Sequence, residues 1–289
     1  MKRLFAVVLA CLLASLTVFL SACTNNSGNE TITETNEEVS DSKKTLKVGM
    51  ECGYAPFNWT QLDDSNGAVK ISGSSDYAGG YDVEIAKKIA DGLGMELEIV
   101  KTEWDGLVPS LQSGIIDLII AGMSPTAERK ESIDFTDNYY KSDLVIVVKA
   151  GGPYENATKL SDFAGAKITA QLNIFHYSVI DQIEDVDIQT AMSDFPTMRV
   201  ALESGVIDGY VSERPEGVSA TAANSNFAMV VFEEGNGFVA NDDDVAVAAG
   251  IKKGNDDLKS QINEILAEIS DEDRLAIMDS AITNQPVVQ

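Results

Sequence analysis

Two charged residues, Arg129 and Glu213, are the first candidates for chemistry in this sequence. Arg129 lies at the start of an expected helix that follows an apolar stretch, and a planar guanidinium can bind a carboxylate through two parallel hydrogen bonds. Charged hydrogen bonds of this kind contribute about 1.5–3 kcal/mol each. By residue type and position alone, Arg129 favours a surface ion pair with Glu128 or Glu131. Glu213 ends a second apolar stretch, where its carboxylate could bind a cation. The alternative is an ion pair between Glu213 and the adjacent Arg214.

Two aromatic residues and an acid follow expected strand ends. Tyr54 comes after the first strand, and Glu51 precedes it by three positions. Trp104 lies between Glu103 and Asp105, an unusual setting for a core residue. An acid with two aromatic faces suits a cation, because Coulomb attraction and the cation–π interaction act in the same direction. The alternatives are aromatic residues in the core and a solvated charge at the strand end.

Composition excludes several classes of protein. The 289 residues include 46 Asp and Glu against 21 Lys and Arg, a formal charge of −25, so the chain lacks the basic surface that nucleic acid requires. The single histidine, His176, leaves few candidates for metal sites or for enzymes with a nucleophile–His–acid arrangement. His176 itself is expected to be structural, and neither a metal nor another cofactor is expected.

The N-terminal sequence predicts export and lipid anchoring. A basic start at Met1–Arg3 and an uncharged apolar run at Leu4–Leu20 are typical of a secretory signal. The tetrapeptide Leu20-Ser21-Ala22-Cys23 resembles a bacterial lipobox. The resemblance implies cleavage after residue 22 and acylation of Cys23, and two or more acyl chains suffice for stable anchoring. An uncleaved transmembrane helix is the alternative.

Residues 23–44 are expected to form the lipidated cysteine and a flexible tether, since they are rich in Asn, Ser, Thr and Glu. Of the three cysteines, Cys11 would leave with the signal and Cys23 would be lipidated. Cys52 would then stand alone, without an internal disulfide. Beside Glu51, its thiol is expected to have a raised pKa and to be a poor nucleophile.

The folded sequence begins at Thr45 and alternates strands with helices. The expected order is a strand at Leu46–Met50, a helix from a cap at Asp82 to a stop at Gly94, a strand at Met95–Val100, a helix at Leu107–Ser113 and a strand at Ile115–Ala121. Successive β-α-β units predict a parallel sheet of the α/β class.

The same module occurs twice. Residues 111–121 and 202–212 both read as a helix end, Ser-Gly, two β-branched residues, Asp and a buried strand. Lys47–Met50 is likewise echoed by Lys167–Ala170. The repeat predicts two similar α/β lobes, and ligands of such sheets bind beyond the carboxyl ends of the strands. That rule places Glu51, Gly122–Ser124, Gln171–Phe175 and Ser212–Glu213 around one cleft.

Several motifs between Thr45 and Ile282 resemble those of the family 3 extracellular solute-binding proteins. They are Gly80-Tyr81-Asp82-Val83-Glu84-Ile85, Tyr54-Ala55-Pro56-Phe57, Ala121-Gly122-Met123-Ser124 with Glu128-Arg129-Lys130, and Ile133-Asp134-Phe135-Thr136 with Tyr139-Tyr140. The resemblance implies a two-lobed periplasmic-binding-protein-like fold of type II. Two hinge strands are expected near Tyr139–Asp143 and Asp244–Ala248. Residues 45–140 and 246–289 would form lobe 1, and residues 141–245 lobe 2.

The resemblance also implies roles for the candidate residues. Arg129, with Ser124, would bind the α-carboxylate of an amino acid. Glu213, where the family usually has Asp, would bind the α-ammonium together with the Gly122 carbonyl. Tyr54 and Trp104 would enclose the ligand side chain.

Glu51 would face the far end of that side chain. Gln171–Phe175 stands where the family commonly has a Gly-Thr element, and the Asn173 side chain or the backbone N–H groups there could replace it. The expected ligand-binding set is Glu51, Tyr54, Trp104, Gly122, Met123, Ser124, Arg129, Gln171, Asn173, Ile174, Phe175 and Glu213.

The expected function is that of a lipid-anchored, monomeric receptor on the extracytoplasmic face of a bacterial membrane. It would pass a polar amino acid to an ABC permease. Arginine or lysine is favoured because Glu51 would repel an acidic ligand, and glutamine is possible. The alternatives are an enzyme on the same fold, resembling cyclohexadienyl dehydratase, and a sensory or adhesive lipoprotein.

Overall fold

The computed structural model describes residues 43–286. The expected signal at 1–22, the lipidated Cys23 and the tether up to residue 42 lie outside the described residues. Within 43–286, no helix has both the length and the apolar character needed to cross a bilayer. The described chain builds two five-stranded sheets and one small four-stranded sheet.

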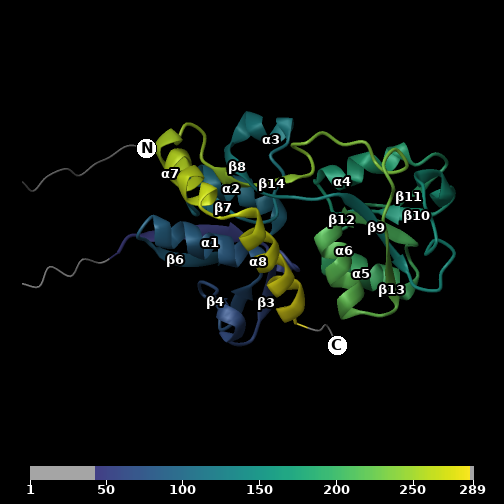
Figure 1. The fold of residues 1–289 in the computed structure, drawn as a ribbon, viewed down its shortest axis with the longest axis horizontal. Coiled ribbons are helices and arrows are strands. Elements are labelled where there is room, and N and C mark those ends of the chain that lie inside the picture. Colours follow the sequence, from purple (N-terminus) through teal and green to yellow (C-terminus); the bar gives the residue numbers. More distant parts are fainter. Residues whose placement is uncertain (1–42, 287–289) are drawn as a thin grey trace, which may run out of the picture. The chain divides into compact units, whose positions relative to one another are not determined.

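The first sheet has the strand order β6-β1-β7-β14-β8 (Figure 1). Its strands are β1 (Thr45–Met50), β6 (Glu96–Lys101), β7 (Leu118–Ile119), β8 (Asp134–Lys141) and β14 (Ala246–Ile251). β1 pairs in parallel with β6 and β7, as the β-α-β pattern predicts. β14 is antiparallel to both β7 and β8, because it returns from the second sheet. The sheet is therefore mixed.

The second sheet repeats this arrangement in the order β11-β10-β12-β9-β13. Its strands are β9 (Leu144–Lys149), β10 (Lys167–Thr169), β11 (Asp187–Ile188), β12 (Gly209–Glu213) and β13 (Phe227–Val230). β10 is parallel to β11 and β12, whereas β9 is antiparallel to β12 and β13. The two sheets thus share both strand order and direction, which confirms the predicted pair of similar lobes.

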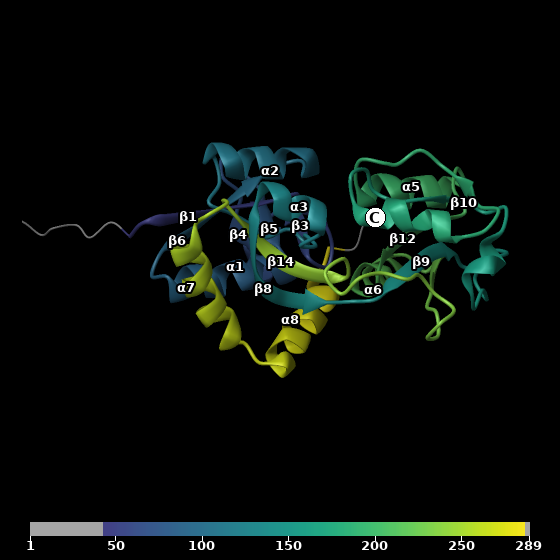
Figure 2. The ribbon, with the colours of Figure 1, turned by 90° about the horizontal axis from the view of Figure 1, so that it is seen from above.

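Helices cover both sheets. They are α1 (Tyr81–Gly92), α2 (Trp104–Ser113), α3 (Ala127–Ser132), α4 (Phe175–Ser178), α5 (Phe195–Ser204), α6 (Arg214–Ala223), α7 (Asp256–Ala267) and α8 (Asp271–Asn284). Figure 2 shows α2 on one face of the first sheet and α1 with α7 on the other. Short 3₁₀ turns η1 (Ser65–Gly67), η2 (Leu160–Phe163) and η3 (Val179–Gln182) and the small sheet of β2 (Gly53–Tyr54), β3 (Asn58–Gln61), β4 (Val69–Lys70) and β5 (Tyr77–Gly79) complete the fold.

The chain crosses between the sheets at two neighbouring points. It leaves the first sheet between Lys141 and Leu144 and returns just before Ala246. The Ser142 N–H donates to the Val245 carbonyl at 3.0 Å, so the two connections run side by side. Two adjacent connections of this kind are what the expected hinge strands require.

Two local expectations were wrong. The helix at Asp82 begins earlier, with Gly80 as its N-cap. Asp82 is instead buried in the first turn, where it accepts hydrogen bonds from Asn58 and Tyr139 at 2.8 Å each. The strand expected over 115–121 is only β7, because the chain turns through Gly114 in the left-handed region and Ile115 is left exposed.

Candidate functional site

A cavity between the two lobes gathers residues from the strand ends of both sheets. It is lined by Tyr54, Trp104, Gly122, Ser124, Arg129, Gln171, Ile174, Phe175, His176, Phe195 and Glu213. The free space among these side chains is about 20 Å³, which is room for about one water molecule. Most of the expected ligand-binding residues therefore come together, and the side chains nearly fill the space they enclose.

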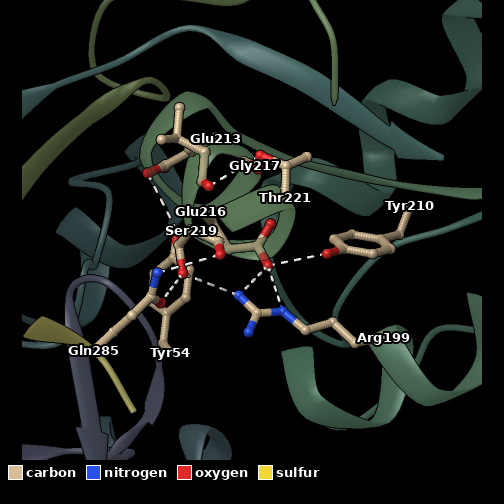
Figure 3. A network of polar contacts seen from close by, with 10 residues as sticks. Tyr54, Arg199, Tyr210, Glu213, Glu216, Gly217, Ser219, Thr221 and Gln285 are labelled. Atoms are coloured by element: carbon tan, nitrogen blue, oxygen red, sulfur yellow. Dashed lines mark hydrogen bonds and ion pairs between the residues drawn. The ribbon is translucent and has the colours of Figure 1, made fainter. Parts of the chain in front are cut away.

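Glu213 is the buried negative charge of this cavity. It ends β12 and is only 2 % exposed. The Tyr54 hydroxyl donates to its Oε2 at 3.2 Å, a contact that Figure 3 shows, and the His176 Nε2 lies 3.5 Å from its Oε1. Arg214 turns away from Glu213 to pair with Asp143 at 2.9 Å. The alternative ion pair between Glu213 and Arg214 therefore does not form.

Arg129 is the positive charge of the same cavity. Thr126 caps its helix and accepts from the Arg129 N–H. The guanidinium donates to the carbonyls of Ser124 at 2.9 Å and Asn173 at 3.3 Å. It also lies over the Trp104 ring at 5.0 Å from the centroid. Burial lowers the Arg129 pKa to about 10, which leaves the side chain charged at neutral pH.

Carbonyl oxygens, and no carboxylate, surround that guanidinium. Across residues 43–286, no acid lies within 4.0 Å of Arg129, so the alternative pair with Glu128 or Glu131 does not form. A partly desolvated guanidinium with neutral partners is a favourable site for an anion. Arg129 and Glu213 therefore place opposite charges on the wall of one cavity.

The aromatic residues pack differently from the expected enclosure of a ligand. The Tyr54 ring stacks against Phe195 of the other lobe at 4.4 Å and against Phe57 at 4.9 Å between centroids. Trp104 faces the Arg129 guanidinium instead. Tyr54 and Phe195 both line the cavity, and their stacking contributes to the small free space. A ligand side chain between Tyr54 and Trp104 stays a prediction, and it requires these rings to separate.

Glu51 lies beside the cavity without lining it. Its Oε1 accepts a hydrogen bond of 2.9 Å from Gln171 Nε2, across the two lobes. Burial raises the Glu51 pKa to about 8, and the nearby charges of Asp194 and Glu103 act in the same direction. Burial likewise raises the pKa of the neighbouring Cys52 thiol to about 12, as expected for a poor nucleophile.

Two further residues of the expected set face elsewhere. The Asn173 side chain donates to Asp105 at 2.8 Å, and only its carbonyl reaches Arg129. The αL backbone of Asn173, with φ of 60°, turns the residue this way. Met123 is 1 % exposed and packs in the hydrophobic core, and it does not line the cavity.

Sequence reasoning missed two residues of the cavity, His176 and Phe195. His176 directly follows the expected Gln171–Phe175 segment. Its position next to that segment could have indicated that it lines the cavity. Phe195 lies at the first position of α5, one residue after the Asp194 cap. Its approach to Tyr54 depends on how the two lobes meet, which no local pattern reveals.

Comparison with known proteins places this geometry in context. Residues 46–281 match the bacterial extracellular solute-binding proteins, family 3. A probable histidine-binding protein of Campylobacter jejuni is 35% identical over 222 residues, covering 73% of this chain and 78% of that protein. The L-cystine-binding protein TcyJ of Escherichia coli is 31% identical over 227 residues, covering 78% and 77%.

The crystal structure of an amino acid ABC transporter substrate-binding protein from Streptococcus pneumoniae, bound to L-arginine, has a similar fold. Its TM-score is 0.72 at 28% identity, and the match covers 83% of this chain and 94% of that one.

Proposed function

The chain belongs to family 3 of the bacterial extracellular solute-binding proteins, and from this premise we propose that it binds a free amino acid with a basic side chain between its lobes. It would deliver that ligand to an ABC permease. The similar proteins named above are described as binding histidine, cystine and arginine. We infer an amino-acid ligand from these similar proteins, and we infer that its side chain is cationic from the position of Glu51 beside the cavity.

One observation carries the proposal: Arg129 and Glu213 line the same buried cavity. The α-carboxylate and α-ammonium of an amino acid need one partner of each sign. Glu213 is 2 % exposed, and a buried carboxylate gains from a cationic partner. A zwitterion therefore satisfies both walls of the cavity at once.

The preference for a basic side chain rests on Glu51 and the aromatic residues. Glu51 lies next to the cavity and is held by Gln171 at 2.9 Å. A cationic side chain favours ionisation of a carboxyl whose pKa burial has raised, and Trp104 already faces one guanidinium. An acidic ligand brings no cation to Glu51 and would raise its pKa further, so it gains no ion pair there.

Capture requires the lobes to move. A free space of about 20 Å³ cannot hold an amino acid, so Tyr54 and Phe195 must separate before a ligand enters. The paired connections near Ser142 and Val245 are the points about which the lobes would turn. Residues 45–140 with 246–289 and residues 141–245 are the two proposed moving units.

The remaining parts of the proposal concern the cellular setting. The sequence at 1–23 supports export and acylation of Cys23, which would hold the protein at the outer face of the membrane by residues 24–44. We also propose that the chain acts as a monomer and as a carrier protein, without catalysis. A dehydration assay with prephenate tests that last point, and turnover by the purified protein would contradict it.

The central experiment is a thermal-shift screen of the twenty amino acids, followed by calorimetry. A ligand that binds only the folded state raises the melting temperature by mass action. Arginine or lysine should give the largest shifts, and Glu51→Gln should weaken their binding. Arg129→Ala and Glu213→Ala should each abolish measurable binding, because removing one partner leaves a buried ligand charge unpaired at a cost of about 3–5 kcal/mol.

Two controls accompany the screen. Circular dichroism must show that both alanine variants keep their fold. Glutamate and glutamine test the side-chain preference, since they keep the zwitterion and change only the far end. Near-native affinity in either alanine variant would contradict the assignment of the zwitterion site.

A further inference from the structure

The single histidine of the chain lies against the buried acid of the cavity. His176 on α4 is 4 % exposed and lines the cavity. Its Nε2 lies 3.5 Å from Oε1 of Glu213. Its Nδ1 is buried and has no hydrogen-bond partner in the described part of the chain. Among the described residues, Glu213 is therefore the one polar partner of the ring, which also packs against Phe175 at 5.4 Å between centroids.

Tyr54, Arg129, Asp82 and Tyr140 also act electrostatically on or with Glu213, but within residues 43–286 His176 is the one cationic side chain in ion-pair range of it. Tyr54 donates its hydroxyl to the second carboxylate oxygen and stays neutral, because burial raises its pKa well above 10. Arg129 lines the same cavity and binds carbonyls. On η3, which packs against α4, Asp181 is exposed to solvent. Within 43–286, Glu213 is the one carboxylate in ion-pair range of His176.

We propose that His176 is the resident cation of Glu213, that the α-ammonium of the bound amino acid replaces it, and that binding thereby releases a proton from His176 to solvent. This inference rests on the proposed function, because it needs an ammonium group at Glu213. An imidazole is the side chain whose charge can change between pH 5 and 8. As an imidazolium it balances the buried carboxylate while the lobes are open.

Two cations cannot share this carboxylate without repelling each other across a short, poorly solvated distance. The ammonium cannot lose its proton cheaply near pH 6, since an α-amino group titrates well above that pH. The imidazolium therefore deprotonates. His176 and Glu213 belong to the same lobe, on α4 and β12, so their contact does not depend on closure.

The sign of the effect follows from linkage. Because the bound state holds fewer protons, affinity rises with pH through the range in which the imidazole titrates. Full linkage of one proton changes the dissociation constant about tenfold per pH unit within the range between the titration midpoints of the ligand-bound and the free protein. Above it, affinity should be independent of pH until the ligand ammonium itself titrates.

The protein offers a direct measurement, because it contains one histidine. In untagged protein with isotopically labelled histidine, the imidazole ring signal in NMR reports the protonation of His176 alone. We expect its titration midpoint to fall by at least one pH unit when the best ligand of the amino-acid screen is added. A midpoint that stays constant or rises while the ligand binds would overturn the proposal and leave the proposed function intact.

Calorimetry at pH 6 in phosphate and in Bis-Tris gives an independent readout, since these buffers differ in ionisation enthalpy. Proton release makes the apparent binding enthalpy more exothermic in Bis-Tris. His176→Gln keeps a donor for Glu213 but cannot be protonated, so in the Glu51→Gln background, where residue 51 cannot release a proton either, this buffer difference should vanish. In Glu51→Gln the difference should persist. Loss of the difference in Glu51→Gln instead would assign the proton to Glu51 and overturn the proposal. Absence of any amino-acid binding would overturn the proposed function as well.

Discussion

Glu51 of the first lobe and Gln171 of the second are joined by a hydrogen bond of 2.9 Å between Oε1 and Nε2. The contact buries a carboxyl group between the lobes, and burial raises the Glu51 pKa to about 8. Gln171 is held in turn by its donation to the Ser193 carbonyl at 3.0 Å. Glu51, which we expect to select the charge of the ligand side chain, is thus also a group whose raised pKa makes stability depend on pH.

A raised folded-state pKa gives stability that is fully present below the unfolded value near 4.5 and is lost as pH rises to about 8. The native state binds the extra proton in this window, so Glu51 makes the free energy of unfolding fall by up to about 1.4 kcal/mol per pH unit. Glu51→Gln should flatten the dependence measured by urea unfolding between pH 5 and 8.

Asp82 provides the control for this prediction. Burial raises its pKa to about 7, so the Glu51→Gln variant should keep a smaller negative slope. Parallel stability curves for the wild type and the variant would show that Glu51 ionises normally in the folded protein.

A second prediction concerns the close approach of Gly122 to Tyr54. Gly122 has φ of 63°, and a Cβ there would lie 2.5 Å from Tyr54 Cε1. Gly122→Ala should therefore cost about 1 kcal/mol in backbone strain and a further 1–3 kcal/mol in overpacking. It should also weaken amino-acid binding at least tenfold, because Tyr54 must shift.

Gly114 offers a matched control. Its φ is 79°, and a Cβ there would meet nothing within 4 Å. Gly114→Ala should show the backbone strain alone and leave affinity unchanged. Equal losses of stability in urea unfolding, together with equal affinities by calorimetry, would contradict the proposed contact.

The repeat explains why so much of the fold was predictable from sequence. Gly114 and Gly205 both end a helix in the left-handed region, with φ of 79° and 78°. Each is followed three residues later by an aspartate, Asp117 or Asp208, that binds the N–H of a strand lysine at 2.9 Å. Each aspartate bonds a strand that neighbours its own in the same sheet, although the partners are 70 and 41 residues apart in sequence. The repeat predicts these contacts because the same residue types recur at the same points of both sheets.

Features that depend on contact between distant segments, within one lobe or between the two, were less predictable. The position of Glu213 at the end of β12 and of Arg129 in α3, which follows β7, depends on the topology of each lobe. The stacking of Tyr54 on Phe195 and the pairing of His176 with Glu213 do not, because both depend on side chains from distant segments. Asp82 was assigned to a cap for a similar reason: its partners Asn58 and Tyr139 lie 24 and 57 residues away.

The paired aspartates give a third prediction. Asp117 accepts from the Lys47 N–H, and Asp208 accepts from the Lys167 N–H. Asp117→Ala and Asp208→Ala should each lower the free energy of unfolding by about 1–2 kcal/mol. The two losses should add within about 0.5 kcal/mol, because the sites are distant.

Urea unfolding of both single variants and the double variant tests this expectation. Asp117→Asn keeps an acceptor oxygen and should lose less stability than Asp117→Ala. A stability loss in Asp117→Asn as large as that in Asp117→Ala would show that charge, and not the hydrogen bond, carries the effect.

The last prediction concerns a buried ion pair in the second lobe (Figure 3). Arg199 on α5 donates to Oε1 of Glu216 on α6 from Nη2 at 2.8 Å and from Nε at 3.0 Å. The Tyr210 hydroxyl donates to the same oxygen at 3.0 Å. Glu216 is completely buried, and its Oε2 has no partner within residues 43–286. The carboxylate therefore depends on Arg199 for its charge balance.

Removing Arg199 alone should be more harmful than removing both charges. Arg199→Met leaves an unpaired buried carboxylate and should destabilise the protein by about 3–5 kcal/mol. Arg199→Met with Glu216→Leu replaces the pair by apolar side chains, which is often close to neutral for stability. Chemical unfolding of the wild type, the single variant and the double variant compares these costs. A double variant that is less stable than the single variant would show that the ion pair itself, and not the desolvated charge left by Arg199→Met, dominates the energetics of this site.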